Sequence, residues 1–149
     1  MSLLHATCVA IGPWAILLRG PSGSGKSDLA LRLLGRADLA ARLVADDQVE
    51  VSRRGDELWA TAPAQIAGMM EVRGVGLVTV ESEMEARLGL VLDLSLPVSR
   101  MPEKTFYALD GVDLPLYPCA PFEASAPDKI ALLVRSLDED ILRSWRRLR

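Results

Sequence analysis

The chain has 149 residues, half of them hydrophobic and a quarter charged, which suits one domain with a substantial core and excludes wholesale disorder. Its formal net charge is −3, so it lacks the basic balance of a typical nucleic-acid binder. The sequence shows neither a secretory signal nor an apolar run long enough for a membrane helix. Cys8 and Cys119 lie far apart and are expected to be reduced, buried thiols. We therefore expect a single cytoplasmic domain over residues 1–149 that binds neither nucleic acid nor a membrane.

The hydrophobic pattern predicts an α/β fold that is rich in strands. In chain order we expect strands at 4–11 and 15–18, a helix at 27–34 that ends at Gly35, a strand at 43–45, a hairpin of 49–52 and 58–61, and strands at 77–80 and 88–94. The six prolines between 97 and 127 predict loops with one short strand. Residues 125–128 resemble a capping box that opens a last helix, with an apolar stripe over 130–141.

The most specific pattern in the sequence is GxxxxGKS, placed between a predicted strand and a predicted helix. Glycines allow successive main-chain N–H groups to converge on one anion, and the following helix adds its positive end. The lysine supplies a cation for the outer phosphates, and the last hydroxyl is placed to ligate Mg²⁺. A chance glycine-rich turn is the alternative, and the strand-helix context counts against it. The predicted site for ATP and Mg²⁺ consists of Gly20, Pro21, Ser22, Gly23, Ser24, Gly25, Lys26 and Ser27.

Two carboxylates, Asp46 and Asp47, end the next predicted strand. In a P-loop protein a carboxylate here can reach the metal or the attacking group, and adjacent carboxylates can raise one pKa and create a proton acceptor. Without the P-loop, a solvated turn would be the more common explanation of this pair. His5 is the only histidine and could face the carboxylates if the first strand lies beside the P-loop strand; otherwise it is a strand-end or core histidine.

A second glycine motif, Glu-Val-Arg-Gly-Val-Gly, covers residues 71–76. Glu71 could complete a metal shell, and Arg73 could hold a transferring phosphoryl group, in a loop that bends or moves. An ion-paired turn before a strand fits the same residues. The basic end could dock a partner or simply offset a helix dipole; it consists of Arg143, Arg146, Arg147 and Arg149.

Together these segments resemble one family, the bacterial HPr kinase/phosphorylase catalytic domain. The matching pieces are His5, GPSGSGKSDLAL at 20–31, LVADDQV at 43–49 and MEVRGVGL at 70–77, which cover roughly the first half of the chain. The resemblance implies a P-loop domain with a strand-rich mixed sheet, like that of phosphoenolpyruvate carboxykinase, assembled as a hexamer. It implies an enzyme that uses ATP to phosphorylate a serine of HPr, a small carrier protein of the sugar phosphotransferase system. It also implies the reverse reaction, in which phosphate accepts the phosphoryl group and pyrophosphate is released.

The resemblance also implies roles for individual residues. Lys26 would hold the phosphates, and Ser27 and Glu71 would bind Mg²⁺. Asp47 would accept and return the serine proton, with His5 and Asp46 assisting. The start of the chain near His5 resembles the short form of the family that lacks an N-terminal domain.

The sequence departs from the family pattern in its second half. A Pro-Gly-Arg-Asn segment tied to the phosphorylase reaction is absent, and residues 114–123 stand in its place. Kinase activity is therefore better supported than phosphorylase activity. Two other functions remain open: a small-molecule kinase on the same loop, and a nucleotide-binding regulator without catalysis.

Overall fold

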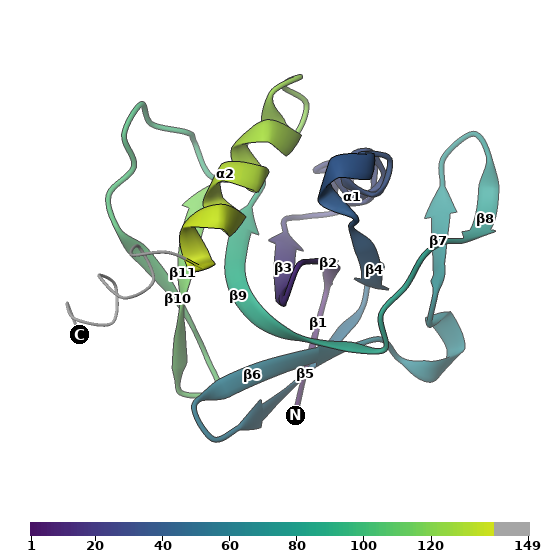
Figure 1. The fold of residues 1–149 in the computed structure, drawn as a ribbon, viewed down its shortest axis with the longest axis horizontal. Helices are drawn as coiled ribbons and strands as arrows, with labels where there is room; N and C mark the ends of the chain where they lie inside the picture. The colour runs from purple at the N-terminus through teal and green to yellow at the C-terminus, as the bar shows by residue number, and fades with distance from the viewer. Residues whose placement is uncertain (139–149) are drawn as a thin grey trace.

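The computed structural model describes residues 1–138 of the chain. In these residues three strands precede the first helix and eight lie between the two helices, so most strands are in the first two thirds of the chain (Figure 1). The strands are β1 (Ser2–Leu4), β2 (Ala6–Ile11), β3 (Trp14–Arg19), β4 (Arg42–Ala45), β5 (Val49–Arg54), β6 (Glu57–Thr61), β7 (Met69–Val72), β8 (Gly76–Thr79), β9 (Glu85–Asp93), β10 (Thr105–Leu109) and β11 (Val112–Pro118). The helices are α1 (Lys26–Leu34) and α2 (Ala126–Asp138), with short 3-10 turns at Ala37–Leu39 and Ala64–Ile66.

A nine-stranded mixed sheet forms the body of the described domain. Seven of its strands follow the order β1-β5-β6-β9-β3-β2-β4, and the other two, β10 and β11, join it through the pairing of β11 with β9. The long strand β9 runs parallel to β3 on one side. On its other side, β9 pairs antiparallel with β6 at its start and parallel with β11 at its end. Figure 1 shows the sheet curling along β9 as a result. This mixed α/β architecture confirms the predicted fold class.

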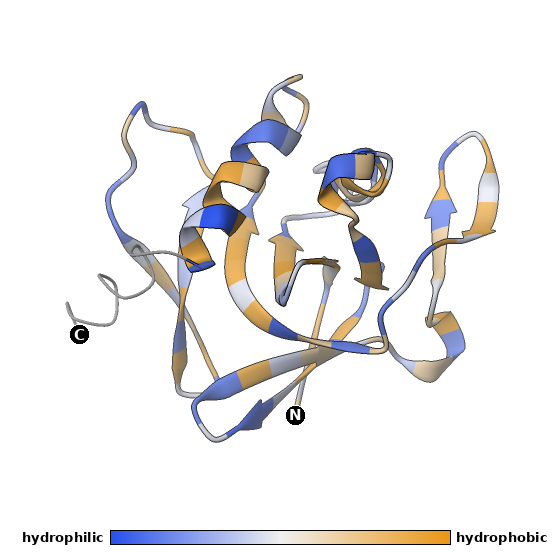
Figure 2. Cartoon of the chain, viewed as in Figure 1, coloured by the Kyte–Doolittle hydropathy of each residue, from blue (hydrophilic) through white to orange (hydrophobic). Residues whose placement is uncertain are grey.

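Alternating side chains of the central strands fill two separate cores. On one face, Ile16, Leu18 and Leu90 pack with residues of both helices, including Leu29 of α1 and Ile130 of α2. On the other face, the intervening residues, such as Leu17 and Val91, pack with β5, β6 and β11 inside the curl of the sheet. Because both faces of β2, β3 and β9 are covered, these strands read as nearly continuous apolar runs (Figure 2). Cys8 and Cys119 are free and buried, as predicted.

Most elements of the first half agree with the prediction, but β7 was not predicted as a strand and one predicted strand is divided. The predicted strand at 4–11 is divided into β1 and β2 by a bend at His5. β1 pairs with β5, whereas β2 pairs with β3 and β4. The break therefore sends one segment to two different parts of the sheet.

The prediction for residues 97–127 was wrong in part, because this region holds the hairpin of β10 and β11. Its turn is Asp110-Gly111, with φ values of 49° and 80°. Pro115 and Pro118 lie in β11. In the described residues, β11 pairs only with β10 as far as Pro115 and reaches β9 from Leu116 onward, so the missing N–H of Pro115 interrupts no pairing with a second strand. α2 begins at Ala126 as predicted, while Ile141 and the basic end lie outside the described residues.

Candidate active site

The P-loop, residues 20–27, connects the end of β3 to the start of α1. Gly23 and Gly25 have φ values of 82° and 100°, which explains why glycine is needed at both positions. Gly25 caps α1, and its carbonyl accepts the first helical hydrogen bond, from Leu29 N, at 2.9 Å. Lys26 is only 7% exposed, and its Nζ donates to the carbonyls of Gly20 and Pro21 at 2.6 and 3.0 Å. The structure thus holds a cation beside the free N–H groups of a helix start, which is an anion site.

One further observation fits a phosphate at this loop. The hydroxyl oxygen of Ser24 is buried and makes no hydrogen bond within the described residues. Buried polar atoms normally have a partner, and a phosphate oxygen is one that this loop is built to receive.

Asp46 lies against the P-loop, at the end of β4. Its Oδ1 accepts hydrogen bonds from Ser27 Oγ at 2.7 Å and from Thr7 Oγ1 at 3.1 Å. Asp46 is 8% exposed and Thr7 is fully buried on β2. A hydroxyl and a carboxylate at this separation can together hold Mg²⁺, which usually takes one or two protein carboxylates and completes its shell with phosphates and water. Thr7 was not predicted, because its part depends on the pairing of β2 with β4.

Asp47, unlike the buried Asp46, remains accessible. Its φ of 69° is in the left-handed region, which aspartate tolerates better than most residues. Its side chain is 67% exposed and pairs with His5 Nδ1 at 3.3 Å. The other ring nitrogen of His5, Nε2, lies 3.5 Å from Ser22 Oγ of the P-loop. His5 therefore connects the exposed carboxylate to the phosphate loop, as the sequence suggested.

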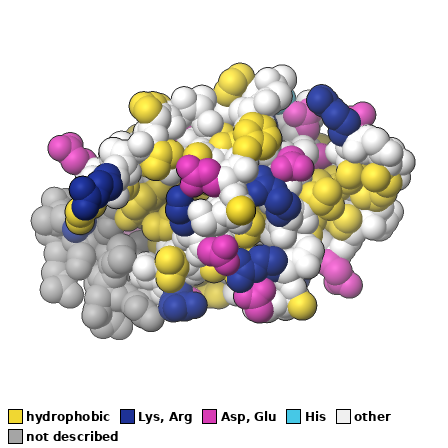
Figure 3. All heavy atoms as spheres, turned by 90° about the horizontal axis from the view of Figure 1, so that it is seen from above, with side chains coloured by type: hydrophobic (Ala, Val, Ile, Leu, Met, Phe, Trp, Pro, Cys, Tyr) yellow, Lys and Arg dark blue, Asp and Glu magenta, His cyan; other side chains and the backbone are white. Residues whose placement is uncertain are grey.

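The structure does not bring every predicted residue into this cluster. Glu71 and Arg73 lie exposed on the β7–β8 hairpin, which forms a second, two-stranded sheet. In the described part of the chain, neither takes part in an ion pair, and the contacts of Ser27 and Asp46 do not include them. Met70 anchors the hairpin in the core beside α1, while Val75 and Leu77 remain exposed. Figure 3 shows apolar side chains gathered at this end of the molecule, on the right.

A third acidic residue near the P-loop, Asp93, escaped the sequence analysis. Asp93 ends β9, beside the P-loop strand, and is 6% exposed. It accepts hydrogen bonds from the N–H and hydroxyl of Ser95 at 2.9 and 2.6 Å and pairs with Arg19 at 3.6 Å. These partners identify Asp93 as a residue that fixes the chain after β9.

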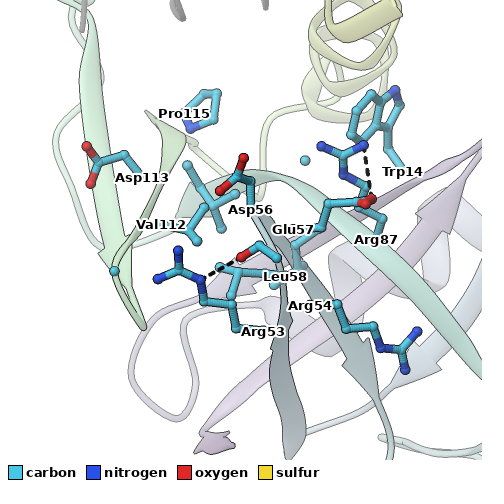
Figure 4. A pocket seen from close by; sticks show the side chains of 15 residues that line it. Trp14, Arg53, Arg54, Asp56, Glu57, Leu58, Arg87, Val112, Asp113 and Pro115 are labelled. Atoms are coloured by element: carbon cyan, nitrogen blue, oxygen red, sulfur yellow. Dashed lines mark hydrogen bonds and ion pairs between the residues drawn. The ribbon is translucent and has the colours of Figure 1, made fainter.

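A pocket of about 820 Å³ lies elsewhere, between the β5–β6 and β10–β11 hairpins (Figure 4). Trp14, at the start of β3, lines it, so it is at the opposite end of the P-loop strand. Several of its charged residues have local partners: Arg87 pairs with Glu57 at 3.3 Å, and Arg53 donates to the Gly55 carbonyl at 2.7 Å. This pocket has no part in the phosphate site, which lies where the central strand β3 ends.

A phosphate loop between strand and helix, with a carboxylate at its hydroxyl, defines a P-loop phosphate-binding protein of the α/β class. The comparisons with known proteins narrow this class. The family model for the HPr serine kinase C-terminal domain matches residues 1–87. The chain belongs to this family.

Curated relatives carry the same family name. The chain is 42% identical over 81 residues to an HPr kinase/phosphorylase of an Exiguobacterium species, covering 54% of this chain and 25% of that protein. It is 34% identical over 114 residues to the HPr kinase/phosphorylase of Caldanaerobacter subterraneus, covering 74% of this chain and 36% of the relative. The chain thus spans about a quarter to a third of the length of these relatives.

A solved structure has the same fold. The HPr(Ser) kinase/phosphatase of Coxiella burnetii superposes with a TM-score of 0.75 over 91% of this chain and 95% of that chain, at 23% identity. Because it covers 91% of the chain, the likeness extends past residue 87, where the match to the family model ends. Within residues 1–138, no helix is both long and apolar enough to cross a bilayer.

Proposed function

We propose that this chain is an ATP- and Mg²⁺-dependent protein kinase that phosphorylates a serine of HPr. The observation that carries the proposal is the joint placement of Ser27, Asp46, Asp47 and His5 around the P-loop. Family membership supplies the substrate, since the relatives are HPr kinase/phosphorylases.

The two carboxylates are suited to different tasks. Asp46 is buried and hydrogen-bonded to Ser27, so it is held where a metal ligand is needed. Asp47 is largely exposed, so the hydroxyl of a protein substrate can reach it. We assign Asp47 as the group that accepts the serine proton, and His5 as the residue that orients Asp47 against the P-loop.

The remaining residues bind and neutralise phosphate. Main-chain N–H groups of the P-loop and Lys26 bind the phosphate oxygens, and the start of α1 favours their negative charge. When bound, Mg²⁺ would neutralise charge on the transferring phosphoryl group, with Ser27 and Asp46 as its protein ligands here. Glu71 and Arg73 stay candidates for metal and phosphoryl contacts from the β7–β8 hairpin, as the resemblance implies.

The test is incubation of the 149-residue chain with HPr, ATP and Mg²⁺, followed by intact mass and mapping of the modified residue. We expect one phosphate on one serine of HPr. Asp47→Asn should abolish transfer and largely spare nucleotide binding, because it removes the proton acceptor and leaves the loop unchanged. Asp56→Asn, an exposed carboxylate in the β5–β6 turn, is the matched control and should behave as the parent.

A second arm supplies phosphate to phosphoserine-HPr and measures pyrophosphate. Release of pyrophosphate would show that the reverse reaction does not require the Pro-Gly-Arg-Asn segment. Bound ATP with no modified HPr in the first arm would refute the proposed substrate. It would favour a small-molecule kinase or a regulator without catalysis.

A further inference from the structure

The loop that follows β11 lies directly on the P-loop. Cys119 N donates to the Asp93 carbonyl at 3.0 Å, which carries the chain across the end of β9 toward α1. A Cβ built on Gly25 would lie 2.8 Å from Cζ of Phe122 and 3.3 Å from Cγ of Pro121. The edge of the Phe122 ring therefore touches the last glycine before Lys26. This contact connects residues 114–123, where the sequence departs from the family pattern, to the phosphate site.

Arg32 of α1 anchors the main chain of this loop just before and just after Phe122. Its guanidinium donates to the carbonyl of Pro121 and, at 3.4 Å, to the carbonyl of Glu123. Asp28 pairs with Arg32 at 3.1 Å. Lys129 of α2 pairs with the Glu123 carboxylate at 2.7 Å. Phe122 is thus held between two anchored carbonyls rather than on a free loop.

Phe122, on this anchored loop, is nevertheless 70% exposed. A large aromatic side chain that is held in place with most of its surface open is suited to receive a flat partner. The base of a nucleotide is attached through its sugar to the phosphates that the adjoining loop binds. Stacking of a base on an aromatic ring is a common and favourable contact in nucleotide recognition.

We propose that Phe122 is the stacking surface for the base of the nucleotide whose phosphates bind at the P-loop. This inference rests on the nucleotide-binding part of the proposed function and is independent of the substrate HPr. The ring offers a π-face and no hydrogen-bond donor or acceptor, so it contacts adenine and guanine in the same way. Phe122 is then a binding residue for the donor nucleotide, outside the GxxxxGKS pattern.

The test compares a ligand that has a base with one that has none. Binding of ADP and of inorganic tripolyphosphate, each with Mg²⁺, is measured by calorimetry on the 149-residue chain. We expect Phe122→Ala to raise the Kd for ADP by about 5- to 150-fold, the usual range for losing one stacked base, and to leave the Kd for tripolyphosphate within about twofold. Phe122→Trp should retain ADP binding, because it keeps an aromatic face.

Two further variants serve as controls for this comparison. Leu132→Ala removes an exposed apolar side chain from α2 and should change neither Kd. Lys26→Ala should weaken both ligands, because both carry phosphates. Since Phe122 is exposed, its replacement should leave the thermal unfolding midpoint near that of the parent, which shows that the variant folds.

Three outcomes would overturn the inference. Equal weakening of both ligands by Phe122→Ala would mean that the ring shapes the loop and does not contact the base. Unchanged ADP binding with a raised KM for HPr would place Phe122 in a protein contact. A parent chain that binds no ADP would remove the inference together with the nucleotide site, whereas ADP binding without transfer to HPr would refute only the proposed substrate.

Discussion

Thr7 offers a sharp test of how the sheet positions Asp46 and Asp47, because its buried hydroxyl bonds to the carboxylate of one and to the main-chain N–H of the other. Thr7 Oγ1 donates to Asp46 Oδ1 at 3.1 Å and accepts from Asp47 N at 3.4 Å. Thr7→Val keeps the shape of the side chain and removes both interactions. The Asp47 N–H then loses its partner, and Asp46 keeps only its bond to Ser27.

The size of the effect follows from these contacts. Leaving a partly buried polar group unpaired costs about 1–3 kcal/mol, so we expect the free energy of unfolding to fall by about 2 kcal/mol. Phosphoryl transfer should fall about 10- to 100-fold, because small displacements of catalytic groups are costly. Thr7→Ser is the matched control: it keeps the hydroxyl and loses one methyl group, at about 1 kcal/mol of stability.

Urea unfolding and the rate of HPr phosphorylation, measured on both variants, test this role of the Thr7 hydroxyl. The expected pattern is a stable, active Thr7→Ser and a less stable, slow Thr7→Val. Equal rates for the two variants would refute the reasoning, because the hydroxyl would then have no part in placing Asp46 and Asp47.

Three more predictions concern single residues. His5→Ala should lower the transfer rate about tenfold and change the free energy of unfolding by less than about 0.5 kcal/mol, because its pair with Asp47 is exposed; an unchanged rate would exclude the orienting role. Gly25→Ala should abolish ADP binding in calorimetry, because φ is 100° and the added Cβ would meet Phe122; normal binding would contradict the described loop. Burial raises the pKa of the Cys8 thiol far above its usual value. The folded state then keeps the proton that the unfolded state releases, so stability is full below pH about 8.5 and declines above it. Urea unfolding at pH about 9.5 should show an additional loss of about 1.4 kcal/mol for the parent that Cys8→Ala lacks, and equal losses in both would count against this linkage.

The parts of the fold that the sequence predicted well depend on local rules. The P-loop and α1 follow from glycines, a lysine and one apolar helix face within a short segment. The turn between β5 and β6 follows from Gly55-Asp56 between two alternating strands. The β10–β11 turn carries an equally local signal, Asp110-Gly111, which favours a two-residue hairpin. The number of prolines around it concealed that signal.

The missed features depend on contacts between distant residues. Thr7 reaches Asp46 across 39 positions of sequence, only because β2 pairs with β4. Phe122 reaches Gly25 only because β11 lies beside β9 and its loop crosses to α1. Neither residue has a distinctive neighbour in sequence, so no local pattern could have identified them.

The register of the sheet explains why His5 belongs to the site. β2 is antiparallel to both β3 and β4, so the start of β2 lies where the other two strands end. Ala6 pairs with Arg19, one residue before the P-loop, and Ala6 N donates to the Asp47 carbonyl at 3.2 Å. A residue just before Ala6 must therefore lie between the phosphate loop and the carboxylate pair. The bend between β1 and β2 releases His5 from strand pairing at this point, which frees its ring to contact both sides.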